Sequence, residues 1–304
     1  MTKLPASRPS RVVIEPVSPV VDGGRFAAKV ALGEHVVVQA DIFADGHDAI
    51  AAAVRWRTVP AKGRPSAWVE LPMVFEGNDR WSARFVPAKL GRCEYQLVAW
   101  SAHAATWRRG TVKKVDADVD VSVELLEGTA IASALAAHAH AGKGNAARAD
   151  AARLDALAAE RAGGDTSALD DDTWDDLFWR HESREPIATS DALPVDVDPQ
   201  RGRFSAWYEF FPRSTIHPAT GHATLRDAIE RLDYVAAMGF DVVYLPPIHP
   251  IGVVNRKGRN NSTVAAPDDT GSPWGIADHL AVHPDLGTLD DVHAFVAACR
   301  ERCM

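Results

Sequence analysis

The sequence has few cysteines, no long apolar run and no excess of basic residues, and each lack excludes a class of protein. Its 304 residues include three cysteines, Cys93, Cys299 and Cys303, which form neither an even-numbered disulfide framework nor a metal-binding spacing. We therefore expect a reducing, cytoplasmic environment and no metal site. The first residues, Met1–Pro9, lack the apolar core of a signal peptide.

No stretch of the sequence is long and apolar enough for a membrane span, which needs about 20 residues. The nearest candidate, the Ala-rich run Ile131–Ala141, is too short and contains His138 and His140. The formal net charge is −8, because 41 acidic residues outnumber 33 basic ones. An acidic balance argues against a large nucleic-acid-binding surface, which needs clustered Lys and Arg. We predict no nucleic-acid partner and no membrane partner.

Residues 1–120 carry the pattern of a β-rich domain. Short runs rich in β-branched and aromatic residues are separated by Gly, Asp and Pro turn signals, and several runs alternate. These runs are Arg11–Val17, His35–Phe43, Ala51–Arg57, Trp68–Met73, Trp81–Phe85 and Tyr95–Trp100. Regularly spaced short strands predict an N-terminal antiparallel β-sandwich. Its tryptophans fit an inward-facing core better than a sugar-binding platform, since large aromatic side chains dominate cores.

Residues 121–185 change in composition and predict a helical domain inserted after the sandwich. Ala, the strongest helix former, dominates Ala130–Ala162, and glycines at 142, 144, 163 and 164 divide the run. A further helix is predicted around Trp174, Leu177 and Phe178, whose spacing places them on one face. The Pro-, Asp- and Ser-rich segment 185–202 is typical of a connector.

Residues 186–304 contain the pattern of an α/β unit. The runs Ser205–Phe211 and Asp241–Leu245 predict two strands, with an amphipathic helix at Thr224–Met238 between them. A long loop over 248–285 follows, and then a final helix. Strand, helix, strand, loop and helix in this order predict the start of a parallel sheet. In a barrel of such units the loops after the strands build the site, so we expect ligand contacts from the long loop.

Capping signals mark the ends of the two predicted helices in this part. Thr224 with Asp227, and Thr288 with Asp291, have the spacing of a capping box at a helix start. Gly239 stands where a left-handed residue ends a helix. These signals place the two helix starts at 224 and 288.

Three segments resemble the α-amylase superfamily, glycoside hydrolase family thirteen. Trp207–Ser214 is similar to the first barrel strand of that family, Gly239–Ile248 to its second strand, and Asp278–Thr288 to the segment before its second barrel helix. The resemblance implies that residues 186–304 are the first part of a catalytic (β/α)8 TIM barrel. The expected fold is therefore multidomain: a β-sandwich, a helical insert and an incomplete TIM barrel.

The long loop narrows the resemblance to the maltosyltransferases that use α-maltose 1-phosphate. The segments His249–Gly252, Asn255–Ser262 and Gly271–Gly275 are similar to theirs, as is a sandwich with a helical insert ahead of the barrel. The resemblance implies transfer of a maltosyl group from α-maltose 1-phosphate to the non-reducing end of an α-1,4-glucan, with retention of configuration. It also implies a homodimer, and no metal or organic cofactor.

Five side chains of the loop are candidates for substrate binding. Arg256 supplies positive charge for a phosphate, Asn260 and Asn261 supply amides for hydroxyls, and Trp274 can lie against a sugar ring. In the family that the loop resembles, the lysine of the Arg-Lys-Gly-Arg-Asn-Asn motif binds the donor, which assigns that role to Lys257. The alternatives are a solvated basic loop, asparagines that serve only turns, and a tryptophan that serves only a core.

No residue of the sequence matches a catalytic position. Retaining enzymes of this kind use two carboxylates about 5–5.5 Å apart, and the resemblance implies that they come from later barrel strands. Asp268, Asp269, Asp278 and Asp290 match no catalytic motif. We therefore expect this chain alone to be inactive, because it stops before the residues that perform the chemistry. The segment between Gly275 and Asp278 is also shorter than in similar enzymes.

Two other functions remain open. One is a different α-amylase superfamily enzyme, although such enzymes lack the Arg-Lys-Gly-Arg-Asn-Asn loop. The other is a non-catalytic glucan-binding or dimerising module, which the missing carboxylates favour and the donor-like loop disfavours. An incomplete barrel exposes strand edges and inner faces, so we also predict that residues beyond about 200 are marginally stable or prone to aggregate.

Overall fold

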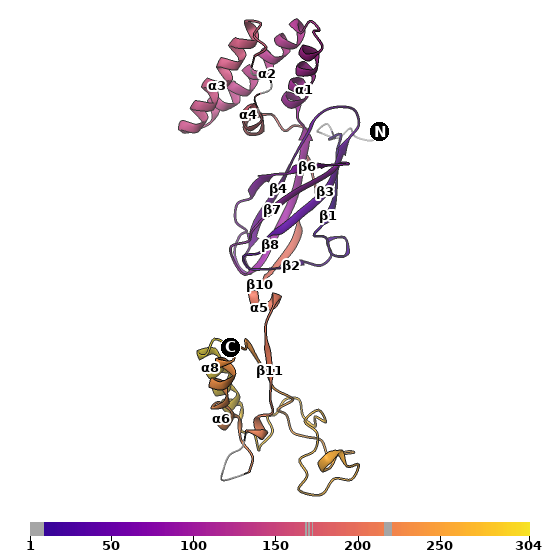
Figure 1. The fold of residues 1–304 in the computed structure, drawn as a ribbon, viewed down its shortest axis with the longest axis vertical. Helices are drawn as coiled ribbons and strands as arrows, with labels where there is room; N and C mark the ends of the chain where they lie inside the picture. The colour runs from indigo at the N-terminus through magenta and orange to yellow at the C-terminus, as the bar shows by residue number, and fades with distance from the viewer. Residues whose placement is uncertain (1–8, 168, 170, 172, 216–220) are drawn as a thin grey trace. The chain divides into compact units, whose positions relative to one another are not determined.

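The chain divides into two compact units, Met1–Pro199 and Gln200–Met304. The structure is a computed structural model, shown in Figure 1, and it describes residues 9–304 except 168, 170, 172 and 216–220. The prediction about a signal peptide rests on residues that lie almost entirely outside this described part. The division into three domains at 120 and 185 stays a prediction.

Two sheets of the first unit pack face to face, one antiparallel and the other antiparallel except for one parallel pair. One sheet has the order β1 (Val12–Ser18), β3 (Val36–Ala44), β7 (Arg80–Phe85) and β6 (Val74–Gly77). The other has the order β2 (Ala28–Ala31), β10 (Leu193–Asp198), β8 (Gly91–Ser101), β4 (Ile50–Val59) and β5 (Val69–Pro72), and β9 (Ala188–Thr189) pairs with β8. A short turn, η1 (Asp22–Gly24), precedes β2. All six predicted runs are confirmed as strands of these sheets.

The core of the sandwich comes from alternate residues of both sheets. Val38 and Ile42 of β3 face inward, as do Val54 of β4 and Tyr95 and Leu97 of β8, and all five are essentially inaccessible to solvent. Because side chains of a strand alternate between its faces, the same alternation leaves Val37 of β3 outside. The sandwich therefore buries its tyrosine and branched aliphatic side chains between the sheets, as the sequence pattern predicts.

Two predictions about the first unit are wrong. The segment 185–202 is not a connector throughout, because β10 lies between β2 and β8, antiparallel to β8 and parallel to β2. Leu193, Val195 and Val197 face the core. They alternate with the partly buried Pro194, Asp196 and Asp198, whose composition resembles that of a linker. The segment before residue 120 is not all strand either, since α1 (His103–Asp116) follows β8 and buries Trp107 on one face.

Three further helices complete the first unit. They are α2 (Ser122–Ala141), α3 (Asn145–Ala162) and α4 (Thr173–His181), and α2 and α3 lie side by side in Figure 1. The predicted break at 142–144 is confirmed, and Gly144 takes a positive φ of 99° there. Leu135, Leu154 and Leu177 form their shared core, with Phe178 beside them. A four-helix section therefore encloses its own apolar core.

The second unit begins with α5 (Gln200–Arg203) and has the predicted order of strand, helix, strand, loop and helix. Its strands β11 (Trp207–Glu209) and β12 (Val242–Tyr244) are parallel. Between them lie the turn η2 (Pro212–Ser214) and two short helices, α6 (Leu225–Ala228) and α7 (Arg231–Ala237), where the sequence predicts one. The turn η3 (Arg259–Asn261) lies in the long loop, and the last helix is α8 (Leu289–Glu301).

The predicted capping signals of the second unit are confirmed. Thr224 and Asp227 exchange both bonds of a capping box at the start of α6, and Thr288 and Asp291 do the same at α8. Gly239 takes a φ of 83° after α7, the left-handed conformation that glycine tolerates.

The two faces of the β11–β12 sheet differ in burial. Val243 packs into a core formed chiefly by the helices, with Leu232 and Phe295 buried beside it. On the opposite face, Trp207 is 61% exposed and Tyr244 41% exposed, with their ring centroids 6.3 Å apart. The sheet therefore has one face covered by helices and one face open.

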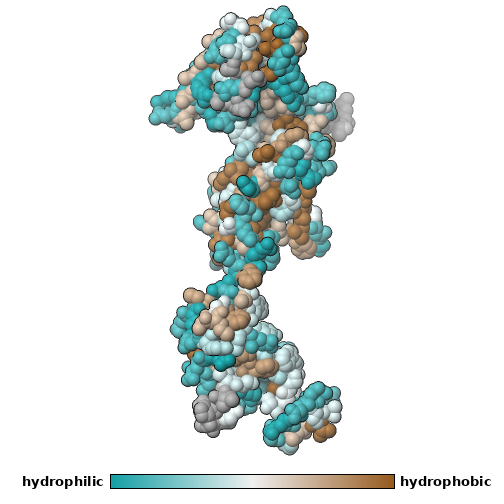
Figure 2. Space-filling view, in the orientation of Figure 1, coloured by the Kyte–Doolittle hydropathy of each residue, from teal (hydrophilic) through white to brown (hydrophobic). Residues whose placement is uncertain are grey.

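The surface mixes polar and apolar residues. The space-filling view in Figure 2 shows hydrophilic and hydrophobic patches interspersed over the visible face of the first unit. Across the described ranges, no helix is both long enough and apolar enough to cross a membrane.

Candidate functional site

The long loop after β12 closes on itself at its base. Ile251 and Ile276 form an isolated β-bridge. The N–H of Gly252 donates to the carbonyl of Gly275 at 2.6 Å, and the N–H of Ala277 donates to the carbonyl of Pro250 at 2.8 Å. These bonds join the two ends of the predicted site loop. The residues between them therefore form a closed excursion at the carboxyl end of β12, where α/β units place their ligand sites.

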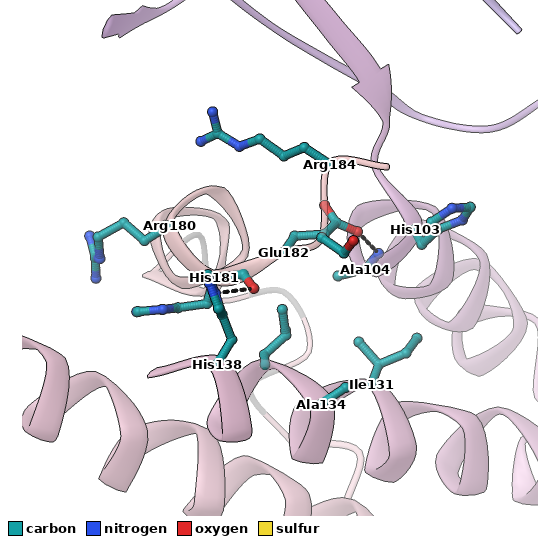
Figure 3. Close-up of a pocket in the computed structure, with 11 residues that line it drawn as sticks. His103, Ala104, Ile131, Ala134, His138, Arg180, His181, Glu182 and Arg184 are labelled. Carbon is teal, nitrogen blue, oxygen red and sulfur yellow. Dashed lines mark hydrogen bonds between the residues drawn. The ribbon is translucent and has the colours of Figure 1, made fainter. Parts of the chain in front are cut away.

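A cavity of about 700 Å³ elsewhere is a second place to look, and Figure 3 shows it among the helices of the first unit. Its charged groups are already bonded: Arg180 pairs with Asp150 at 2.9 Å, and Glu182 accepts the N–H of Ala104 at 2.7 Å. Burial raises the pKa of Glu182 despite that bond. The cavity is lined mostly by carbon, and none of its lining residues carries an uncommitted charge that suits a sugar phosphate.

The loop cavity has a volume of about 540 Å³ and unites three of the five predicted site residues. Arg256, Lys257 and Trp274 line it, together with backbone of Gly252 and Gly275 near the base. Asn260 and Asn261 lie outside its lining. They take positive φ angles of 55° and 63° in η3, which is a conformation that asparagine adopts in turns. Their role in substrate binding stays a prediction.

The two arginines of the loop bond to the loop itself. The Nη2 group of Arg256 donates to the carbonyls of Ala266 and Pro267 at 3.2 and 3.3 Å. Arg259 forms ion pairs with Asp268 at 2.8 Å and with Asp269 at 3.1 Å. Both guanidinium groups therefore hold the shape of the loop.

Lys257 differs from its two basic neighbours. It is exposed, and within the described part of the chain its ammonium group has no hydrogen bond or ion pair. An ammonium group on a long flexible stem acts as a mobile point charge for an anion. Of the three basic residues in the motif, Lys257 is the one that keeps its charge available to a ligand.

Trp274 is not a core residue. Its side chain is 57% exposed, and its ring meets that of Phe211 edge to face, with centroids 5.8 Å apart and planes at 76°. The packing against Phe211 fixes one edge of the indole and leaves much of the ring open. This exposure argues against the alternative in which the tryptophan serves only a core.

A smaller cavity of about 210 Å³ adjoins Phe211 and contains polar residues that the sequence reasoning missed. Arg213, His249 and His283 line it. Arg213 donates to Asp285 at 3.0 Å and holds the pKa of that carboxyl below its usual value, while burial lowers the pKa of His283. Arg213 and His249 lie just after the two strand segments, and that position is the signal that could have found them. His283 lies in the segment ahead of α8.

Three of the four carboxylates that match no catalytic motif have structural partners. Asp278 accepts the N–H of Leu280 at 2.8 Å within a turn, and Asp268 and Asp269 pair with Arg259. Throughout the described ranges, no group of three or more His, Cys, Asp or Glu side chains is placed to hold a metal ion.

The architecture and loop define a multidomain protein in which a β-sandwich and four helices precede a parallel α/β unit with a basic, aromatic site loop. A family profile described as alpha-1,4-glucan:maltose-1-phosphate maltosyltransferase, domain N/S, matches residues 10–199. The chain belongs to this family.

Similar proteins carry the same name. The alpha-1,4-glucan:maltose-1-phosphate maltosyltransferase of Myxococcus xanthus is 45% identical over 291 residues, which cover 94% of this chain and 44% of the relative. The protein of that name from Chlorobaculum tepidum is 42% identical, over 94% of this chain and 42% of the relative. The one from Rhodospirillum rubrum is 43% identical, over 99% of this chain and 45% of the relative. The chain therefore spans less than half the length of these curated relatives.

Proposed function

We propose that this chain is the donor-binding front part of a maltosyltransferase. The enzyme transfers maltosyl from α-maltose 1-phosphate to the non-reducing end of an α-1,4-glucan with retention of configuration. The observation that carries the proposal is the unpaired Lys257 beside the exposed Trp274, in one cavity of a chain from this family. The ammonium group suits the dianionic phosphate, and the indole suits the apolar face of a sugar ring.

The chemistry needs two carboxylates that work in turn. In a retaining transfer, one carboxylate displaces phosphate from the anomeric carbon while the second, protonated carboxyl group gives its proton to the leaving phosphate. The acceptor hydroxyl then displaces the first carboxylate and returns a proton to the second. One glycosidic bond thereby replaces one phosphate ester bond, with no metal or organic cofactor. The described loop carboxylates Asp268, Asp269 and Asp278 already accept bonds from the loop itself, which supports placing both catalytic carboxylates on later barrel strands.

The second unit is the start of a (β/α)8 barrel in this proposal. Its two parallel strands have one face under helices and one face open, with Trp207 and Tyr244 exposed on the open face. Such a face becomes the barrel interior when further strands close the sheet. The three predicted domains are then a sandwich over 1–120, a helical domain over 121–185 and the first barrel part over 186–304, except that β9 and β10 belong to the sandwich and the barrel part begins after Pro199.

The assembly and compartment follow the same proposal. A homodimer through the first unit is supported by an open sheet face, on which Val13, Val37 and Val74 are 44%, 52% and 66% exposed. A cytoplasmic location is supported by the thiol of Cys93, which is free and buried, with its pKa raised to about 11 by burial.

A non-catalytic glucan-binding or dimerising module is the second candidate. The observation that favours it is the absence of an uncommitted pair of carboxylates in the described part of the site loop. Another α-amylase superfamily enzyme has less support, because the similar proteins named above are maltosyltransferases.

The test is release of phosphate from α-maltose 1-phosphate with maltohexaose as acceptor. We would assay this chain alone and a chimera in which the remaining part of the Myxococcus xanthus relative follows it. We expect release only by the chimera, and a large loss on Lys257→Met. Lys89→Met is the matched control, since Lys89 is also exposed but lies in the first unit. A folded chimera that binds glucan and releases no phosphate would favour the module.

A further inference from the structure

The site loop is built around one buried carboxylate. Among the described residues of Gln200–Met304, Asp269 is the only charged residue that is buried, with 7% of its surface exposed. Its neighbour Asp268 has a side chain that is 72% exposed. Burying an ionised carboxylate is costly unless hydrogen bonds satisfy it, so the partners of Asp269 reveal what the burial secures.

Asp269 joins the two arms of the loop. Its Oδ1 atom pairs with the Nε group of Arg259 at 3.1 Å, on the arm that carries the lysine motif. Its Oδ2 atom accepts the N–H of Ala266 at 2.7 Å, and its own N–H donates to the carbonyl of Ala266 at 3.1 Å. One side chain therefore fixes two arms of the loop to each other: the motif arm, which carries Lys257 and Arg259, and the returning arm, which carries Ala266 and Asp269 itself.

Gly258 makes room for this carboxylate. A Cβ atom at Gly258 would first meet the carbonyl oxygen of Val264 and would lie 2.9 Å from Oδ2 of Asp269. The φ of Gly258 is −83°, which any residue tolerates, so close packing rather than backbone strain requires glycine here. The backbone next to Lys257 thus lies directly against the buried carboxylate.

We propose that Asp269 is a positioning residue for Lys257. It acts through Arg259 and Gly258, holds the motif arm of the loop over the cavity and so fixes the backbone position from which the lysine ammonium group reaches a ligand. The ligand is the sugar phosphate of the proposed function, on which this inference rests. A lysine on a fixed backbone loses less conformational entropy when it binds the sugar phosphate than a lysine on a loose loop. The positioning therefore strengthens binding of the sugar phosphate.

Trypsin tests the positioning on the chain as it exists, because the motif supplies three cleavage sites. The protease needs an extended, locally opened backbone, so its rate reports how often the loop opens. We expect Asp269→Asn to raise cleavage after Lys257 about tenfold, the effect of losing a hydrogen bond to a charged group. Cleavage after Lys89, in the other unit, is the internal reference.

Two variants control the result. Asp268→Asn removes the exposed carboxylate that pairs with the same Arg259. It should change the rate of cleavage after Lys257 less than about twofold. Gly258→Ala adds a methyl group that pushes the motif arm away from Val264 and Asp269. It should raise cleavage after Arg259 about as much as Asp269→Asn does. Equal protection in wild type, Asp269→Asn and Gly258→Ala would overturn the proposal.

Adding α-maltose 1-phosphate separates positioning from a purely structural role. We expect the ligand to slow cleavage of the wild type after Lys257, and Asp269→Asn to raise the half-protecting concentration about tenfold. An unchanged half-protecting concentration, with a loosened loop, would show that Asp269 is structural only and overturn the proposal. If α-maltose 1-phosphate does not protect the wild type, the assignment of the loop to the donor is wrong. The cleavage rates without ligand still decide whether Asp269 holds the loop.

Discussion

Arg184 lies over the indole of Trp100, with its Cζ atom 4.2 Å from the ring centroid. The same guanidinium group lies 4.9 Å from the ring of Trp179, donates to the carbonyl of Trp179 at 3.0 Å and pairs with Glu70. Trp100 and Glu70 belong to the sandwich, whereas Trp179 belongs to α4. One side chain therefore ties the helical section to the sheet.

We predict that Arg184→Gln lowers the free energy of unfolding of the first unit by about 2 kcal/mol. Both partners of the Arg184–Glu70 pair are about one-quarter exposed, so the change removes a partly desolvated cation–π contact and an ion pair. Urea unfolding followed by tryptophan fluorescence measures it. Arg25→Gln is the matched control: Arg25 lies 5.1 Å from the Phe26 ring but is 75% exposed, and should change stability by less than about 0.5 kcal/mol.

The second prediction concerns Glu182, which caps the start of α1. Burial raises the pKa of Glu182, so the folded protein favours the protonated acid more than the unfolded chain does. Stability from this group is therefore complete below the unfolded pKa of about 4.3 and is lost as pH rises through the raised folded value. Glu182→Gln keeps an oxygen for the N–H of Ala104 and does not ionise.

The stability of Glu182→Gln relative to wild type should therefore rise with pH above the unfolded pKa of about 4.3, until the folded carboxyl group has ionised as well. Chemical unfolding at several pH values measures this difference, and subtraction of the wild type removes the other titrating groups. A difference that stays constant across this range would contradict a raised pKa. A difference that falls with pH would show that the carboxylate is stabilised by the helix start.

The third prediction compares two helical glycines. A Cβ atom at Gly128 of α2 would lie 2.7 Å from Cε2 of Trp107, whereas one at Gly110 of α1 would meet nothing within 4 Å. Gly128→Ala should cost about 1–3 kcal/mol through overpacking. Gly110→Ala should stabilise by about 0.5–1 kcal/mol, because alanine is the better helix former. Thermal unfolding of both variants measures the difference, and equal shifts would contradict the close packing.

The strands were predictable where their side chains alternate between apolar and polar. β3 and β7 show this, since Val38 and Phe85 fall on the inward positions of their patterns. β10 could not be recognised in the same way. Its aspartates and Pro194 look like linker composition, and its partner β8 lies about a hundred residues earlier. Long-range pairing overrides local composition there.

The residue types of the candidate loop could be read from the sequence, but the partners of its side chains could not. The sequence indicates a basic, amide-rich loop with a tryptophan, and the resemblance assigns the donor to Lys257. Nothing in the local pattern distinguishes Arg259, which pairs with two aspartates, from the unpaired lysine beside it. That distinction depends on how the loop folds back, and Asp269 lies ten residues along the chain from Arg259.

The fourth prediction is that residues 200–304 are cleaved by proteases before the first unit. The second unit leaves Trp207 61% exposed and Phe204 81% exposed, so its unfolding exposes less additional apolar surface than unfolding of the closed sandwich. We would follow limited chymotrypsin digestion by mass spectrometry and expect early cuts after these two residues. Leu232→Ala, at a fully buried position between the helices, should accelerate cleavage in the second unit alone, since such truncations cost about 2–5 kcal/mol. Equal protection of the two units would contradict the prediction and would mean that two strands and their helices suffice for a stable fold.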